Sequence, residues 1–114
     1  MKASKPPLPK ILRIGPYDIR VSVLTAEVAD VEEIFGAYRH AAREIRLDVR
    51  RGSVDVAETL LHEINHAIWQ TYALQERDSE ERIVQALSTG QTQLLRDNPE
   101  LVKWLAVALK EGAK

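Results

Sequence analysis

The alternation of apolar and polar residues changes along the chain from a period of two to a period near 3.6. In the first half, three segments alternate or are rich in β-branched residues, which predicts strands at residues 11–14, 17–24 and 44–49, and a further strand is expected within residues 36–43. Gly15-Pro16 separates the first two and is expected to form a turn. Residues 26–35 fit a short helix and a loop equally well, so their structure stays open.

The second half of the chain carries a helical pattern throughout. It predicts helices from about residue 55 to 72 or 74, from about 79 to 96, and from 99 to about 110. Asp55 and Glu58 have capping-box spacing, and Asn98 is expected to be the N-cap of a helix that begins at Pro99. This order predicts an α+β fold in which a short antiparallel or mixed N-terminal sheet is followed by three helices.

Length and composition point to one small globular domain. The 114 residues suit a single domain over residues 11–114, preceded by a flexible Lys- and Pro-rich arm at residues 1–10. The net charge of −1, without a clustered basic excess, argues against a nucleic-acid partner. We see neither an apolar run as long as a membrane span nor a secretory signal, so we expect a cytoplasmic protein without a membrane partner and, by default, a monomer.

The pentapeptide His62-Glu63-Ile64-Asn65-His66 lies inside the first predicted helix. Residues four apart lie on one face of a helix, so the two imidazoles can bind one Zn²⁺ while the glutamate acts on a metal-activated water. The chain has no cysteine, which leaves histidines and carboxylates as its only strong metal ligands.

A helical wheel separates the two histidines from the apolar stripe that is expected to form the core. Successive residues turn by about 100°, which puts His62 and His66 roughly 160° from Ile64. The face around the histidines carries no Lys or Glu of a solvated surface, so we expect another element to cover it. The stripe itself contains Ala57, Leu60, Leu61, Ile64, Ala67 and Ile68.

A catalytic zinc needs a third protein ligand and an open position. A metzincin would have a histidine at position 72, but Tyr72 stands there and no histidine follows His66. The remaining route is a carboxylate on the next predicted helix, which opens with Glu80-Glu81.

The chain resembles the gluzincin branch of zinc metallopeptidases, in particular the minimal zincin domains common in bacteriophages. The resemblance covers about the C-terminal half and rests on residues 59–67, 80–87 and 97–99. It implies that His62, His66 and Glu81 bind the zinc, with Glu80 as the alternative third ligand. Gluzincins usually carry an acidic residue four positions after the third ligand, and Gln85 departs from that pattern.

We therefore expect a zinc-dependent metallopeptidase that hydrolyses peptide or protein substrates in the bacterial or phage-infected cell, with Glu63 as general base. The alternative is a non-catalytic binding or regulatory module with a structural or vestigial metal site. In either case residues 44–49 are a candidate edge strand for an extended peptide. Tyr38, His40 and Tyr72 are candidates for stabilising the tetrahedral intermediate, although structural roles suit them better.

Overall fold

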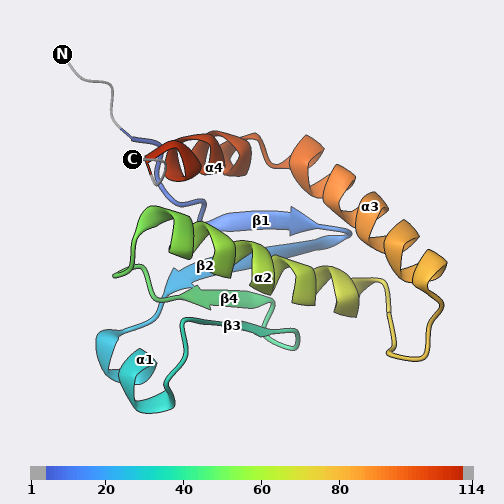
Figure 1. The fold of residues 1–114 in the computed structure, drawn as a ribbon, viewed down its shortest axis with the longest axis horizontal. Helices are drawn as coiled ribbons and strands as arrows, with labels where there is room; N and C mark the ends of the chain where they lie inside the picture. The colour runs from blue at the N-terminus through green and yellow to red at the C-terminus, as the bar shows by residue number, and fades with distance from the viewer. Residues whose placement is uncertain (1–4, 112–114) are drawn as a thin grey trace.

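The computed structural model describes residues 5–111, which form one mixed sheet and four helices (Figure 1). The elements follow one another as β1 (Ile11–Ile14), β2 (Tyr17–Val23), α1 (Ala26–Glu32), β3 (Gly36–Arg39), β4 (Glu44–Leu47), α2 (Ser53–Thr71), α3 (Glu80–Asp97) and α4 (Pro99–Glu111). The predicted α+β class and the order of strands before the long helices are confirmed.

The sheet has the order β1-β2-β4-β3. β1 pairs antiparallel with β2, β2 pairs parallel with β4, and β4 pairs antiparallel with β3. The parallel pair arises because α1 and β3 carry the chain across the sheet before it returns as β4. The expectation that residues 44–49 form an edge strand was wrong, since β4 lies between two strands and β3 forms the edge.

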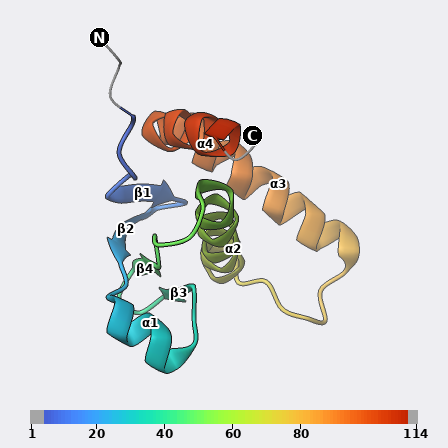
Figure 2. The same cartoon turned by 60° about the vertical axis from the view of Figure 1, so that its left-hand side comes forward.

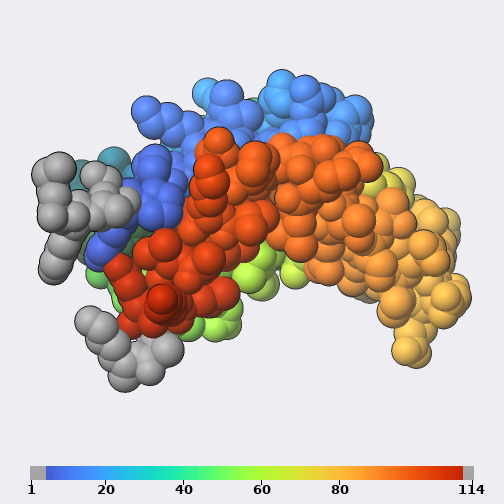
Figure 3. Space-filling view, turned by 90° about the horizontal axis from the view of Figure 1, so that it is seen from above, coloured from blue at the N-terminus to red at the C-terminus, as the bar shows by residue number. Residues whose placement is uncertain are grey.

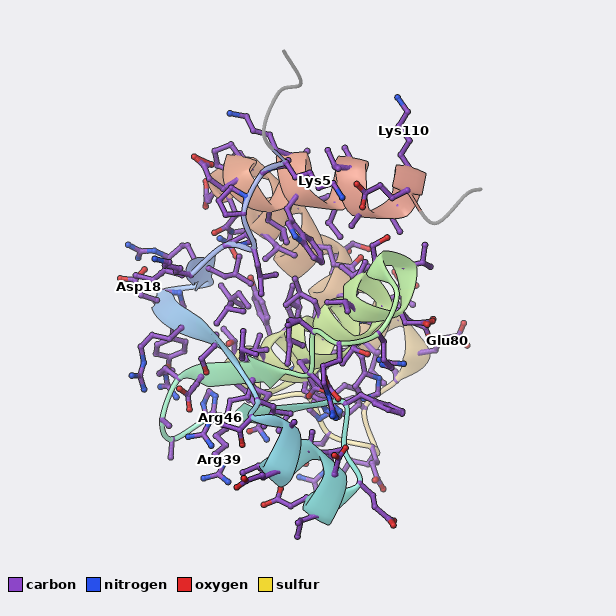
Figure 4. The ribbon with its side chains drawn as sticks, turned by 90° about the vertical axis from the view of Figure 1, so that its left-hand side faces the viewer. Lys5, Asp18, Arg39, Arg46, Glu80 and Lys110 are labelled. Carbon is purple, nitrogen blue, oxygen red and sulfur yellow. The ribbon has the colours of Figure 1, made fainter. Side chains whose placement is uncertain are left out.

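Helix α2 covers one face of the sheet, and the core lies between them. Alternate residues of the strands face α2, whereas the residues between them form a charged face on the other side, where Figure 4 shows Asp18 and Arg39. The largest fully buried side chains come from the sheet, from α2 and from the last two helices: Leu12, Ile14, Ile19, Ile45, Leu47, Leu60, Ile64, Ile68, Leu94 and Leu101.

Helices α3 and α4 pack beside α2 and over the β1 side of the sheet (Figure 2). Gly90 allows α3 to approach α2, because a Cβ atom there would lie 2.7 Å from Ile68 Cγ2 and 3.2 Å from Tyr72 Cε2. Seen from above, the start of α3 projects from one end of the molecule (Figure 3). None of the helices in residues 5–111 has the length and apolar character needed to cross a membrane.

Two predicted helix boundaries hold closely, and one does not. Ser79 is the N-cap of α3, where its hydroxyl accepts a hydrogen bond from Arg82 N–H, and α4 begins at Pro99 as expected. The capping box at Asp55 was wrong, because α2 begins two residues earlier, after Gly52, without a side-chain cap. Residues 26–35, whose structure the sequence left open, contain α1, a helix in addition to the three predicted ones. Its N-cap Thr25 accepts a hydrogen bond from Val28 N–H.

The predicted N-terminal arm is attached to the domain over part of its length. Residues 5–10 have no helix or strand, yet Pro9 is buried and Leu8 packs against the core. Lys5 forms an ion pair of 2.7 Å with Glu111, and the carbonyl of Lys10 accepts a hydrogen bond from Val21 N–H. Residues 1–4 of the arm and residues 112–114 at the end of the predicted domain lie outside the described residues.

Candidate metal centre

His62 and His66 present their Nε2 atoms to each other from successive turns of α2. The two nitrogens are 3.2 Å apart, and the rings meet edge to face at 76°. Two nitrogen ligands of a tetrahedral zinc, each about 2.0–2.1 Å from the metal, lie about 3.3 Å apart. The spacing of these side chains therefore fits a shared zinc ion.

Glu63 completes a compact group of potential ligands. One ligand atom each from His62, Glu63 and His66 lies within 4.8 Å of the others. Residues 5–111 contain no other group of three or more potential metal-ligating side chains this close together. Glu63 is only 6 % exposed, whereas both histidines are exposed. The carboxylate thus lies at the wall of the site, while the imidazoles stand at its solvent side.

The wall against which Glu63 packs is the edge strand β3. A Cβ atom on Gly36 would lie 2.7 Å from Thr59 Cγ2, 3.2 Å from the carbonyl oxygen of Arg46 and 3.3 Å from Glu63 Cγ. Only glycine leaves room for β3 to approach α2 this closely. Gly36 was missed in the sequence because the contact joins residues far apart in the chain.

Arg51 bounds the same wall on the side of Thr59. Its guanidinium donates a hydrogen bond to Thr59 Oγ1 and stacks over the ring of Phe35, 3.8 Å from the ring centre. Thr59 is one helical turn before Glu63, so Arg51 braces the Thr59 contact beside Gly36. These contacts position the first residue of β3 relative to Glu63.

The outer side of β3 carries backbone groups without a partner among residues 5–111. Asp48 N–H donates to the carbonyl of Phe35 at 2.8 Å, which makes this a hydrogen-bonded pair. Such pairs alternate along an antiparallel ladder, so Ala37 and Arg39 bond to β4 while the N–H and C=O of Gly36 and Tyr38 point outward. The free edge therefore begins at the residue that contacts Glu63.

Tyr38 and His40 form a pair farther along β3 and in the turn after it. Tyr38 Oη lies 2.6 Å from His40 Nδ1, and the His40 ring also meets the Tyr17 ring edge-on. Burial raises the pKa of Tyr38 and lowers the pKa of His40, so both are neutral near pH 7. Tyr72 instead packs where α3 approaches at Gly90. A role for these three in stabilising an intermediate stays a prediction.

The two glutamates considered as third ligand lie outside the cluster. Both are exposed residues of the first turn of α3, which starts beyond the C-terminal end of α2, away from its middle (Figure 1). Figure 4 shows Glu80 at the margin of the molecule. Glu81 as a metal ligand stays a prediction, and it requires the first turn of α3 to approach α2.

The expected cover over the histidines was wrong for residues 5–111. His62 and His66 are exposed because α3 packs against the flank of α2, where Gln91 donates a hydrogen bond of 3.2 Å to Asn65. The carboxylate that does share a cavity with both histidines is Glu76, from the connection between α2 and α3. Its position in an irregular segment gives no periodic signal in the sequence.

The chain was compared with protein-family models, with curated proteins and with solved structures, and none of these matches it. The case for a metal centre therefore rests on the geometry of His62, Glu63 and His66 and on the resemblance carried by their motif.

Proposed function

We propose that the protein is a zinc-dependent metallopeptidase of minimal zincin type in which His62 and His66 bind the metal. The observation that carries this proposal is the 3.2 Å spacing of the two Nε2 atoms beside a buried carboxylate. A metal site that is only structural needs no such carboxylate between its histidines. The proposal includes Glu81 as third ligand and a cytoplasmic location in the bacterial or phage-infected cell.

Glu63 is the general base of the proposed reaction. Zinc, when bound, polarises the peptide carbonyl and makes water a stronger nucleophile. Glu63 takes a proton from the attacking water and passes it to the leaving amine, so that a C–O bond forms while the C–N bond breaks. Its packing against Gly36 holds the carboxylate in one place during both transfers.

The substrate adds to β3 as an extended strand in this proposal. Gly36 and Tyr38 offer outward N–H and C=O groups, which pair with a peptide backbone by strand addition. The bound peptide then runs past Glu63, because Gly36 contacts that side chain. In this proposal β3, not the strand predicted at residues 44–49, is the edge strand that binds the extended peptide.

The test is cleavage of a proteome-derived peptide mixture by the zinc-loaded protein, read by mass spectrometry. A chelator should abolish cleavage and added zinc should restore it. Glu63→Gln should lower the rate by about 10²–10⁴-fold, the usual contribution of general base catalysis, while zinc still binds one to one. Glu100→Gln, which changes an exposed carboxylate on α4, is the matched control and should cleave like wild type. A fully active Glu63→Gln protein would contradict the assignment.

The exposure of both histidines and the absence of a second carboxylate from their cluster within residues 5–111 favour one alternative, a peptide-binding module without hydrolysis. The same experiment separates the two functions. One zinc per chain together with no chelator-sensitive cleavage of any peptide would support the binding module.

A further inference from the structure

Two cavities follow each other along the exposed face of α2, and His62 and Asn65 line both. The first has a volume of about 480 Å³, within the range of small-ligand sites, and extends from the histidines toward α3. The second has about 440 Å³ and extends toward the C-terminal end of α4, where Leu109 lines it. The residues lining the first cavity are His62, Asn65, His66, Trp69, Glu76 and Leu87.

The first cavity combines an apolar body with one negative charge. Trp69 and Leu87 supply the apolar surface, and among the described residues Glu76 supplies the only carboxylate that lines it. Within residues 5–111, no lysine or arginine lines either cavity and Glu76 has no ion-pair partner. A side chain with a long apolar stem and a cationic end fits this combination, because the stem covers apolar surface while the cation meets the carboxylate.

Trp69 adds a second reason for a cationic occupant. A lysine ammonium or an arginine guanidinium over an indole ring gains cation–π attraction, for which tryptophan is the best aromatic partner. The second cavity repeats the charge, since among residues 5–111 Glu58 is the only Asp, Glu, Lys or Arg that lines it. Both cavities beside the candidate zinc site therefore favour positive charge.

The position of the first cavity fixes which residue of a substrate would enter it. Both candidate zinc ligands, His62 and His66, form part of its lining. Because one residue of an extended peptide spans only about 3.3 Å, a side chain in this cavity belongs to a residue that borders the bond at the metal. The cavity would therefore bind the side chain of the residue next to the cleaved bond.

We propose that the protein selects peptides with lysine or arginine next to the scissile bond, and that Glu76 and Trp69 determine this preference. The inference rests on the proposed peptidase function, which it deepens by naming the substrate class. Glu76 acts as a specificity-determining residue that contacts the substrate side chain, distinct from the histidines and Glu63.

The test uses two sets of matched peptides. In one set the residue before the cut bond is Lys, Arg, Leu or Glu, and in the other set the residue after it is varied in the same way. Wild type should cleave the Lys and Arg peptides about 5-fold better than the Leu peptide, as expected for one partly exposed ion pair, and the Glu peptide least. Glu76→Gln should remove most of the preference for Lys over Leu, and Glu76→Lys should favour the Glu peptide. Glu100→Gln is the matched carboxylate control and should keep the wild-type preference.

Binding to the Glu63→Gln protein, read from tryptophan fluorescence, separates the failure of this inference from the failure of the proposed function. Preferential binding of Lys and Arg peptides that is lost in Glu63→Gln/Glu76→Gln supports the inference even if no peptide is cleaved. Equal cleavage of all four peptides overturns the inference while the peptidase stands. Equal binding of the four peptides, or no binding of any, also overturns it.

Discussion

The two edges of the four-stranded sheet are finished in different ways. At the β1 edge, Arg13 N–H donates to Asn98 Oδ1 at 2.7 Å, and Arg13 C=O accepts from Asn98 Nδ2 and from Gln93 Nε2. Gln93 Oε1 also accepts from Gly15 N–H at 2.8 Å. At the β3 edge, no side chain of residues 5–111 bonds the outward groups of Gly36 or Tyr38.

This difference separates an edge that side chains close from an edge that stays open. Proteins usually block their edge strands, because unpaired N–H and C=O groups invite pairing with another chain. Here amide side chains from α3 and the α3–α4 junction bond the outward groups of Arg13 in β1, whereas the open strand lies against Glu63. The edge that stays open is the one beside the candidate metal centre, which supports its use for peptide binding.

The largest expected effect comes from opening the closed edge. Asn98→Leu removes three hydrogen bonds of a buried side chain, to both backbone groups of Arg13 and to the carbonyl of Leu94. We expect a loss of about 3 kcal/mol in the free energy of unfolding, since buried polar groups are left without partners. Urea unfolding measures it. Gln91→Leu, which removes an exposed amide hydrogen bond, should change stability by less than about 0.5 kcal/mol.

An equal effect of Asn98→Leu and Gln91→Leu would show that the β1 edge does not need its amide cover. Zinc binding by Asn98→Leu should stay like that of wild type at temperatures where the protein is folded, because Asn98 lies on the β1 side of the sheet.

Gly36→Ala at the open edge should lower stability less than Asn98→Leu does, but it should lower cleavage more. In Gly36→Ala the new methyl group meets Thr59 Cγ2 and the carbonyl oxygen of Arg46, so β3 must move from α2. We expect a loss of about 1–3 kcal/mol, typical of overpacking, together with reduced cleavage because the wall behind Glu63 shifts. Thr59→Ser removes the closer clash while keeping the hydroxyl that Arg51 bonds.

The double variant Gly36→Ala/Thr59→Ser should therefore recover part of both stability and cleavage. The free energy of unfolding and kcat/KM on one cleaved peptide are the measurements. Wild-type values in Gly36→Ala itself would show that close approach at Gly36 does not position the base.

The smallest effect concerns Asp48, which directly follows β4 and whose N–H bonds the carbonyl of Phe35 just before β3. The Arg50 guanidinium, hydrogen-bonded to Asp48 and Asp30, lowers the pKa of Asp48 from 3.8 to about 2. A lowered folded-state pKa contributes stability above the unfolded value, which disappears as the pH falls toward 2. Asp48→Asn should therefore be less stable than wild type at pH 7, with the difference vanishing between about pH 4 and pH 2.

Unfolding by urea at a series of pH values checks the Asp48 prediction. A stability difference between wild type and Asp48→Asn that persisted at the lowest pH would mean that the charge of Asp48 is not its source. Glu27→Gln, which neutralises an exposed acid on α1, is the control and should show little pH-dependent difference.

Local patterns predicted the parts of this fold that depend on nearby residues. The spacing of His62 and His66 gave their common face, and Ser79 and Pro99 marked helix starts that the structure confirms. Short-range signals work for such features because capping and helical faces involve residues within one or two turns.

Contacts between distant residues could not be predicted in this way. Gly36 meets Glu63, and Asn98 bonds Arg13 from 85 residues away, so neither contact leaves a periodic trace. Asn98 was expected as an N-cap, but its side chain instead bonds β1 and the carbonyl of Leu94. β4 was misplaced at the edge because alternation shows that a strand has two faces, not which neighbours it pairs with.

The most direct measurement of the central claim is a crystal structure of Glu63→Gln with zinc and a lysine-containing peptide. The anomalous signal of zinc should lie between Nε2 of His62 and Nε2 of His66, and the peptide should run along β3, paired with the outward groups of Gly36 and Tyr38. The density around the metal would also reveal whether Glu81 is the third ligand. Zinc bound elsewhere, or a peptide away from β3, would contradict the account.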